Sequence, residues 1–186
     1  MTKKEMKLKT LALIEEVNPD SEFLTDDPDI AAKIDYVINM VMFEMCRLKK
    51  IGKYIEMAVN KGDLVTFEDI GNAVGYDIYQ LGTVCGADHL YKANGTVLKI
   101  LESGTLEVDC YVYPERITEK TKDSYEFELS QDVLEIMPYG IAADLLKSDV
   151  SADYGKVYAE RYEAMKNMLD PRFHMGSVRI EGGVSI

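Results

Sequence analysis

The side chains best suited to acid–base or metal chemistry are few in this sequence. It contains two histidines, His89 and His174, and histidine exchanges a proton more readily near neutral pH than other side chains do. His89 follows Asp88 and lies four residues after Cys85, a spacing that could imitate a catalytic or metal-binding cluster on a rigid scaffold. The segment from Gly82 to His89 is predicted to be a loop between strands, so we interpret His89 as a surface or hydrogen-bonded histidine.

Acidic side chains occur in close pairs, which could hold a cation or shuttle protons if their oxygens converged. Sequence proximity alone does not bring those oxygens together, and most such pairs are solvated charges. The sequence has no P-loop, no GxGxxG after a strand and no EF-hand loop, and the glycines of residues 69–75 are predicted to mark a turn or bulge. We therefore predict no catalytic residue, no cofactor and no metal site, in a protein that is not an enzyme. The acidic pairs are Glu15-Glu16, Asp26-Asp27, Glu68-Asp69 and Glu126 with Glu128.

The chain is acidic overall, with 33 Asp and Glu residues against 21 Lys and Arg residues and a formal net charge of −12. Such a surface repels nucleic acid on average, because DNA affinity depends largely on lysine and arginine displacing counterions from the phosphates. Sequence-specific DNA binding is therefore not expected. Four lysines near the start could touch phosphate or acidic partners, but a short charge run is more often a solvated helix face. These are Lys3, Lys4, Lys7 and Lys9.

The three cysteines, Cys46, Cys85 and Cys110, are far apart and form no CxxC pair. This spacing argues against a disulfide framework and against a zinc site. Cys110 falls on the apolar side of an alternating strand pattern, so it is predicted to be a small buried hydrophobic residue. Unpaired thiols suit a reducing compartment.

No segment has the pattern of a targeting signal or a membrane span. The apolar stretch after the first lysines, residues 11–14, ends at Glu15-Glu16, too early for the core of a signal peptide. The most apolar run, from Val37 to Cys46, contains Glu44 and is well short of the roughly 20 residues that span a bilayer. We therefore expect a chain that is made and used in the cytoplasm, with no membrane partner.

The first 52 residues are predicted to be helical. Apolar residues recur about once per turn from Leu8 to Val17, until Asn18-Pro19-Asp20 stops the pattern. Asp27 and Pro28 then provide a helix cap and a first-turn proline, and a wide apolar stripe follows as far as Lys49-Lys50. The stripe could face both its own core and a neighbouring subunit, although a central place in one bundle is the simpler interpretation. Its members are Ile30, Ile34, Val37, Ile38, Val41, Met42, Met45 and Leu48.

At Gly52 the pattern changes from helical to alternating, which indicates strands. Asn94-Gly95 joins two alternating segments as a tight hairpin, because this pair accepts the positive φ angles of a type I′ turn. A further strand is predicted from Leu106 to Tyr113, and Pro114 closes the region. Residues 53–116 are therefore predicted to form an inserted antiparallel β module, either a sandwich or a partial barrel.

Helices are predicted to resume at Ser130, which is a plausible cap. The apolar pattern continues through Met137-Pro138-Tyr139-Gly140, where proline is expected to kink or interrupt the helix. A short connection with Ser151 as the next cap should let the last helix fold back antiparallel on its predecessor, and Asp170-Pro171 should end it.

Tyrosine is the main aromatic residue, with 12 copies against no tryptophan. Its ring packs and its hydroxyl forms hydrogen bonds, which suits interfaces. Tyr111 and Tyr113 alternate with the apolar side of their strand, so they are predicted to point outward. Tyr154, Tyr158 and Tyr162 recur at helical spacing and are predicted to pack against the preceding helix.

A set of packing motifs, all of them in the second half of the chain, carries a family likeness. The motifs are Tyr125–Leu129, Met137–Asp149, Tyr158–Glu163, Leu169-Asp170 and Val178–Ile186. They resemble the virion neck proteins of tailed phages, in particular the head-to-tail connector, or adaptor, family. The likeness covers residues 117–186 best and residues 1–50 more loosely.

The resemblance implies a structural protein of the virion neck that is synthesised and assembled in the host cytoplasm. In that family a small helical bundle forms a ring of about twelve copies beneath the portal, and C-terminal arms reach neighbouring neck proteins. The implied partners are further copies of the chain, a portal protein and a downstream neck or tail protein. The ring would line the DNA path with only non-specific proximity to DNA, since an acidic lining does not grip passing phosphates.

The predicted fold class is therefore α+β, with four parts in chain order. Residues 1–52 and 117–170 form a helical core, residues 53–116 form the β module, and residues 171–186 form an extended docking arm. The arm is rich in glycine and β-prone residues, which suits a segment that adds a strand to a neighbour; simple terminal fraying is the alternative. Its predicted partner-binding residues are Arg172, Phe173, His174, Met175, Val178, Ile180, Val184 and Ile186.

The β module departs from the simplest connector proteins and leaves other functions open. It could widen the outer rim of a ring, contact a capsid or tail component, or present a sugar-binding face. The main alternative is therefore a binding module in which the β insertion recognises carbohydrate or a protein partner and the helices are only a base. A third hypothesis is a small enzyme that uses Asp88 and His89.

Overall fold

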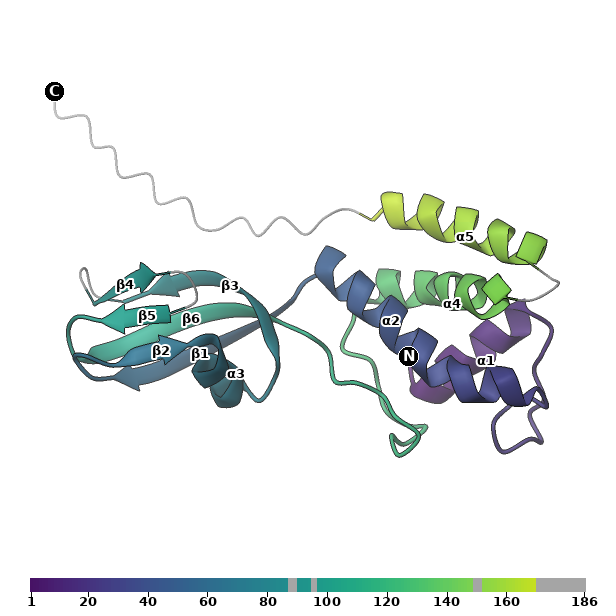
Figure 1. The fold of residues 1–186 in the computed structure, drawn as a ribbon, viewed down its shortest axis with the longest axis horizontal. Helices are drawn as coiled ribbons and strands as arrows, with labels where there is room; N and C mark the ends of the chain where they lie inside the picture. The colour runs from purple at the N-terminus through teal and green to yellow at the C-terminus, as the bar shows by residue number, and fades with distance from the viewer. Residues whose placement is uncertain (87–89, 95–96, 149–151, 170–186) are drawn as a thin grey trace, which may run out of the picture.

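The computed structural model describes residues 1–86, 90–94, 97–148 and 152–169. These residues form two lobes placed end to end, a helical lobe and a β lobe (Figure 1). The β lobe is inserted between the second helix of the chain and the helices that follow it. The predicted α+β class, with an antiparallel β module between helical segments, is confirmed. The predicted arm, residues 171–186, lies outside the described residues.

The helical lobe consists of α1 (Lys3–Leu13), α2 (Pro28–Leu48), α4 (Gln131–Leu145) and α5 (Ala152–Asn167), with a 3₁₀ turn, η1 (Leu146–Ser148), between the last two. Helix α4 is central, because α1, α2 and α5 all pack against it. Helix α5 folds back antiparallel along α4, as predicted (Figure 1). The largest fully buried side chains of this lobe are Met6, Leu11, Ile34, Ile38, Met42, Met45, Met137 and Ile141.

Helix α2 begins where the sequence predicts. The Asp27 carboxylate accepts hydrogen bonds from the backbone N–H groups of Asp29 (2.8 Å) and Ile30 (3.1 Å), and Pro28 occupies the first turn, where its missing N–H costs nothing. The predicted apolar stripe is buried over most of its length. Leu48, at the end of the helix, is 43% exposed and departs from the prediction.

Helix α1 ends earlier than predicted, at Leu13 instead of near Asn18. Its start is fixed by a capping box in which the Thr2 hydroxyl accepts from the backbone N–H of Glu5 (3.2 Å) and the Glu5 carboxylate accepts from the Thr2 N–H (2.8 Å). Glu15 adopts a left-handed backbone with φ 61°, which a right-handed helix cannot accommodate. The apolar spacing therefore continues beyond the point where the backbone leaves the helix.

Helix α4 continues through Pro138, so the predicted interruption at residues 137–140 is wrong. Proline removes one backbone hydrogen bond within a helix, but α4 packs against three other helices and Pro138 itself is buried. Tertiary burial therefore keeps the helix intact. Ser130 is the N-cap residue, as predicted, although its side chain makes no capping hydrogen bond. The other predicted cap, Ser151, lies outside the described residues.

One sheet of the β lobe has the strand order β1 (Ile51–Val59), β6 (Gly104–Val112) and β3 (Ile78–Cys85), all antiparallel. The predicted strand at residues 106–113 is confirmed as β6, which begins at Gly104 and ends at Val112. The predicted loop at residues 82–89 is wrong in its first half, because residues 82–85 belong to β3. Two register irregularities interrupt the pairing of β3, and they disturb the alternation by which a strand is recognised.

The second sheet has the order β2 (Leu64–Thr66), β5 (Val97–Ile100) and β4 (Tyr91–Asn94). The predicted hairpin is confirmed as the antiparallel pair of β4 and β5, although Gly95 in its turn lies outside the described residues. The apolar faces of both sheets join one hydrophobic core with the helices.

A short helix, α3 (Phe67–Val74), replaces the turn or bulge predicted for residues 69–75. A capping box starts it: Thr66 N–H donates to the Asp69 carboxylate (2.8 Å) and Asp69 N–H donates to the Thr66 hydroxyl (3.2 Å). Gly75, with φ 77°, ends it in a left-handed conformation. The glycine therefore marks the end of a helix, and α3 packs against β1, β2 and β3.

The cysteines are free thiols in this structure. Cys110 is fully buried in β6, as predicted, and Cys46 is fully buried in α2, while Cys85 is exposed on β3. Burial raises the pKa of Cys46 to about 11, which disfavours its reactive thiolate. In the part of the chain that the structure describes, we find no helix with the length and apolar character needed to cross a membrane.

Candidate partner-binding surfaces

The residues predicted to bind partners or to do chemistry lie mostly outside the described ranges. Asp88 and His89 are outside them, and Cys85 lies exposed in β3. The arm residues Arg172, Phe173, His174, Met175, Val178, Ile180, Val184 and Ile186 are outside them as well. These predictions stay predictions.

The acidic pairs singled out in the sequence have separate structural roles. Asp27 caps α2 and Asp69 caps α3. Asp26 accepts from the side-chain amide of Asn18 (2.8 Å), and Glu128 accepts from the hydroxyl of Tyr76 (2.6 Å). Among the described residues, no group of three or more His, Cys, Asp or Glu side chains is arranged to hold a metal ion.

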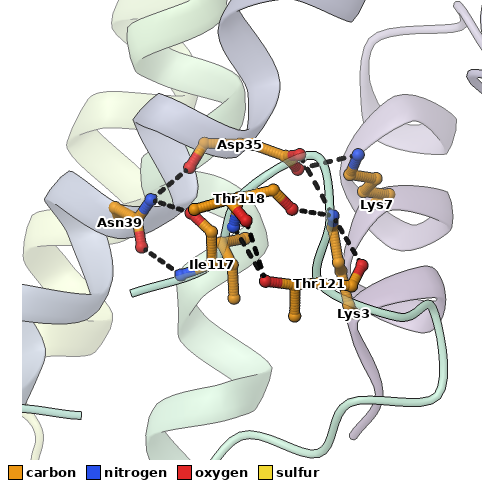
Figure 2. Close-up of polar contacts among 7 residues, drawn as sticks. All are labelled: Lys3, Lys7, Asp35, Asn39, Ile117, Thr118 and Thr121. Carbon is orange, nitrogen blue, oxygen red and sulfur yellow. Dashed lines mark hydrogen bonds and ion pairs between the residues drawn. The ribbon is translucent and has the colours of Figure 1, made fainter. Parts of the chain in front are cut away.

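Two of the N-terminal lysines are internal, so the prediction of a solvated lysine face is wrong at these positions. Lys3 is 2% exposed, and its Nζ lies 3.1 Å from Asp35 Oδ2 on α2. The same Nζ donates to the carbonyl oxygens of Thr118 (2.8 Å) and Thr121 (3.2 Å) (Figure 2). Lys7 Nζ lies 2.7 Å from Asp35 Oδ1, an ion pair without hydrogen-bond geometry. The negative partner comes from another helix, so the lysine spacing alone does not reveal it.

Asn39 extends this cluster by one turn of α2. Its side-chain amide donates to the carbonyl oxygens of Asp35 (3.0 Å) and Ile117 (2.8 Å), and its side-chain oxygen accepts from the N–H of Ile117 (3.0 Å) (Figure 2). The segment that returns from the β lobe is thereby fixed to α1 and α2. We call these residues the lysine–aspartate cluster: Lys3, Lys7, Asp35, Asn39, Ile117, Thr118 and Thr121. It is a structural anchor and not an open binding site.

Aromatic side chains join the two lobes at the end of α2. The ring of Tyr113 lies edge-on to Phe43, with 5.4 Å between centroids, and 4.8 Å from the ring of Tyr79. Arg47 donates to the Tyr113 hydroxyl (2.8 Å), and the Tyr79 hydroxyl donates to the carbonyl oxygen of Cys46 (3.0 Å). Burial raises the pKa of Tyr79 to about 12, with smaller effects from neighbouring thiol and phenol groups.

The outward orientation predicted for Tyr111 and Tyr113 is wrong. Tyr111 is 8% exposed, with the ammonium of Lys50 4.5 Å from its ring centroid, and Tyr113 is half-buried. Tyr113 packs against Phe43 and Arg47 near the end of α2, which covers the side that alternation assigns to solvent. We call the contact of Phe43, Arg47, Tyr79 and Tyr113 the lobe junction.

An open groove of about 1410 Å³ runs beside the lobe junction, between the end of α2, helix α3 and residues 113–116. Its lining combines aromatic rings with charged side chains of both signs, among them Arg47, Glu68, Asp77 and Arg116. The guanidinium of Arg116 lies 4.7 Å from the ring centroid of Phe43. This mixture suits a polar partner more than an apolar small molecule.

The tyrosines of α5 divide between two sides of the helix. Tyr162 packs against α4, as predicted: it is 7% exposed, and its hydroxyl donates to Glu44 Oε2 on α2 (3.0 Å). Tyr158 is half-buried, and its hydroxyl donates to the carbonyl oxygen of Leu13. Burial, together with the Glu44 carboxylate, raises the pKa of Tyr162 well above its usual range. Tyr154 departs from the prediction, because it is 71% exposed.

Large apolar side chains are exposed on two helices of the helical lobe. On α5 these are Tyr154 and Val157, which are 71% and 60% exposed, and Met168, just beyond the end of the helix, is 81% exposed. On α2 they are Tyr36 and Met40, which are 67% and 47% exposed. Isolated apolar residues on a surface need no explanation, whereas groups of them can mark contact surfaces.

Comparison with known proteins assigns this chain to no family. No family model matches it, and no curated protein shows significant sequence similarity to it. Its function must therefore be inferred from its own residues and surfaces.

Proposed function

We propose that this protein is a structural subunit of a tailed-phage neck, a head-to-tail connector that forms a ring between the portal and downstream neck or tail proteins. One observation carries the proposal: the β lobe is a fixed projection of the helical lobe, as the lobe junction indicates. A protein that bridges two layers of an assembly needs such a rigid body, with separate contact surfaces on its two lobes.

Both chain connections between the lobes are held in place, which supports a rigid subunit. The first is short, since α2 ends at Leu48 and β1 begins at Ile51. The second leaves β6 at Val112 and reaches α4 at Gln131, and the lysine–aspartate cluster fixes it to α1 and α2. Neither connection is a free linker of the kind that permits independent lobe motion.

The proposed mechanism is geometric. Faces of the helical lobe are buried between neighbouring copies, the β lobe contacts an adjoining layer, and residues 171–186 dock on a downstream protein. The exposed apolar side chains on α2 and α5 support self-association. The net charge of −12 supports a conduit that does not retain DNA.

The test is the assembly state of the full-length chain. Native mass spectrometry and electron-microscopy class averages, over a range of concentrations and with the cognate portal present, are expected to show a closed ring. A chain that stays monomeric under all these conditions would refute the proposal. Deleting residues 171–186 should leave the monomer folded and abolish docking on the downstream protein. Replacing the same residues with an inert sequence of equal length controls for chain length and should abolish docking as well.

A second candidate function is a binding module, and the groove beside the lobe junction favours it. Aromatic rings and polar side chains from the β lobe, including Phe67, Asn72 and Tyr76, line this groove. Such a module would bind a glycan or peptide as a monomer. Glycan and peptide arrays probed with the full chain, with a Phe67→Ala variant for comparison, separate it from the connector, whose assembly does not require a groove ligand.

A further inference from the structure

The two chain connections between the lobes enter the β lobe side by side. The first residue of β1, Ile51, is the cross-strand partner of the last residue of β6, Val112, and both lie at the end of the sheet nearest the helical lobe (Figure 1). Paired residues of adjacent antiparallel strands are about 5 Å apart. Two connections so close together act as one hinge, so side-chain contacts must fix the direction in which the β lobe projects.

The lobe junction restrains this hinge from one edge of the sheet. In the strand order β1-β6-β3, the hinge lies at the ends of β1 and β6. The junction reaches the third strand, because the hydroxyl of Tyr79 on β3 donates to the carbonyl oxygen of Cys46 on α2 (3.0 Å). A contact at the β3 edge alone does not prevent a swing at the opposite edge.

A polar cluster stands at that opposite edge, on β1. Glu128, three residues before α4, accepts from the Tyr76 hydroxyl (2.6 Å), and its second carboxylate oxygen lies 3.4 Å from Lys53 Nζ on β1. The same ammonium lies 4.3 Å from the centroid of the Tyr76 ring. Each of the three residues therefore contacts the other two. We call them the Glu128 latch: Lys53, Tyr76 and Glu128.

The segment that carries Glu128 belongs to the helical lobe. The backbone N–H of Phe127 donates to the carbonyl oxygen of Met1 (3.2 Å). Phe127 and Leu129, the neighbours of Glu128 in the chain, are buried. The contact of Glu128 with β1 is therefore a contact between the two lobes.

The latch is exposed enough to open. The side chains of Lys53 and Glu128 are 31% and 38% exposed, and ion pairs at such positions add little to the stability of the fold. Burial lowers the pKa of Lys53, but its contacts with Tyr76 and Glu128 outweigh this effect and raise the pKa. Loss of the latch should therefore change the angle between the lobes more than the resistance of the protein to unfolding.

We propose that the Glu128 latch sets the angle between the two lobes, and that opening it lets the β lobe swing about the joined ends of β1 and β6. The inference rests on the proposed function in one respect, since a closed symmetric ring requires the same lobe angle in every copy. The angle can be measured on the monomer, so the latch is tested separately from assembly.

The experiment measures the distance between two spin labels on the full-length chain by pulsed electron paramagnetic resonance. One label is attached to Cys85, which is exposed on β3, and the other to an Ala32→Cys substitution at an exposed position of α2. Cys46 and Cys110 are buried and should not react. The partner of Cys85 on β6 is five residues from the hinge end of that strand, or about 17 Å. A swing of about 15° would therefore move this label by about 4 Å.

Two variants open the latch, and one serves as a control. Glu128→Ala removes both contacts of the carboxylate, and Tyr76→Phe removes the hydroxyl alone. Each should broaden or shift the distance distribution while the thermal midpoint stays close to that of the wild type, and the double variant should go no further than Glu128→Ala. Glu126→Ala is the matched control and should keep the wild-type distance. Glu126 is exposed on the same segment and has no ion pair among the described residues.

Three results would overturn the inference. An unchanged distance in Glu128→Ala would show that packing at the hinge alone fixes the angle. A wild-type distance in Tyr76→Phe, beside a changed one in Glu128→Ala, would exclude a latch of three residues. An equal change in Glu126→Ala would indicate an effect of charge on the segment instead of the latch. If the latch variants change the angle as expected but the wild type never forms a ring, the latch stands and the connector function fails.

Discussion

Asp35→Asn tests whether the lysine–aspartate cluster holds the helical lobe together. The Lys3 and Asp35 side chains are 3% and 18% exposed, and 3.1 Å separates Nζ from Oδ2. Removing one partner of a buried ion pair typically costs about 3–5 kcal/mol, because the other charge stays buried without compensation. Lys3 keeps the carbonyl oxygens of Thr118 and Thr121, so we expect the lower end, about 3 kcal/mol.

The assay is equilibrium urea unfolding followed by far-ultraviolet circular dichroism, which suits a chain without tryptophan. The midpoint should fall while the slope of the transition stays unchanged, since a lower midpoint at constant slope reports lost stability. The control is Lys9→Gln, which breaks the pair of Lys9 with Glu135. Those side chains are 46% and 48% exposed, so the control should cost about 0–1 kcal/mol.

A loss for Asp35→Asn no larger than that for Lys9→Gln would refute the anchoring role. A double variant, Lys3→Met with Asp35→Leu, sharpens the test. Replacing a whole buried ion pair by apolar groups is often close to neutral, so the double variant should lose less stability than the sum of its single changes, by about 1 kcal/mol or more. Strict additivity would show that the two side chains do not interact.

Two further predictions concern packing and pH. Gly140→Ala should lower stability, because the new Cβ would lie 2.8 Å from the Tyr162 ring and overpacking costs about 1–3 kcal/mol. This cost should outweigh the preference of alanine over glycine in a helix, which is about 1 kcal/mol. A raised thermal midpoint would contradict the prediction. Burial raises the pKa of Tyr79 above its ordinary 10.0 to about 12, so its contribution to stability is complete below pH 10 and is lost as pH rises through about 12. Across this window, the stability of Tyr79→Phe should fall less steeply with pH than that of the wild type, while tyrosinate absorbance follows the ionisation of the tyrosines. An unchanged pH dependence of stability would count against the assignment to Tyr79.

Features that local chemistry determines could be predicted from the sequence. The cap at Asp27 and the burial of Cys110 depend on residues close by in the chain. The change of pattern near Gly52 correctly marks the passage from helix to strand. These features follow from backbone propensity and periodicity, which act over a few residues.

The remaining features depend on partners distant in sequence. Lys3 is buried because Asp35 and two carbonyl oxygens from the returning segment surround it. Tyr111 is buried although strand alternation assigns it to solvent, and the ammonium of Lys50 lies 4.5 Å from its ring centroid. Helix α4 passes through Pro138 because three helices pack around it. In each case tertiary contacts override a local preference, and no single stretch of sequence reveals those contacts.

The α5 tyrosines show why residues spaced by four do not all lie on one face of a helix. A step of four residues advances about 40° beyond a full turn, so two such steps rotate Tyr162 about 80° away from Tyr154. A run of residues spaced by four therefore cannot stay on one face, and the observed exposures of 71% for Tyr154 and 7% for Tyr162 follow this drift. Alternating steps of three and four do stay on one face. Within α5, Tyr154, Val157, Arg161 and Ala164 have that alternation, and all four are exposed. The buried side of α5 is therefore the side that carries Tyr162, and the run of tyrosines spaced by four does not define it.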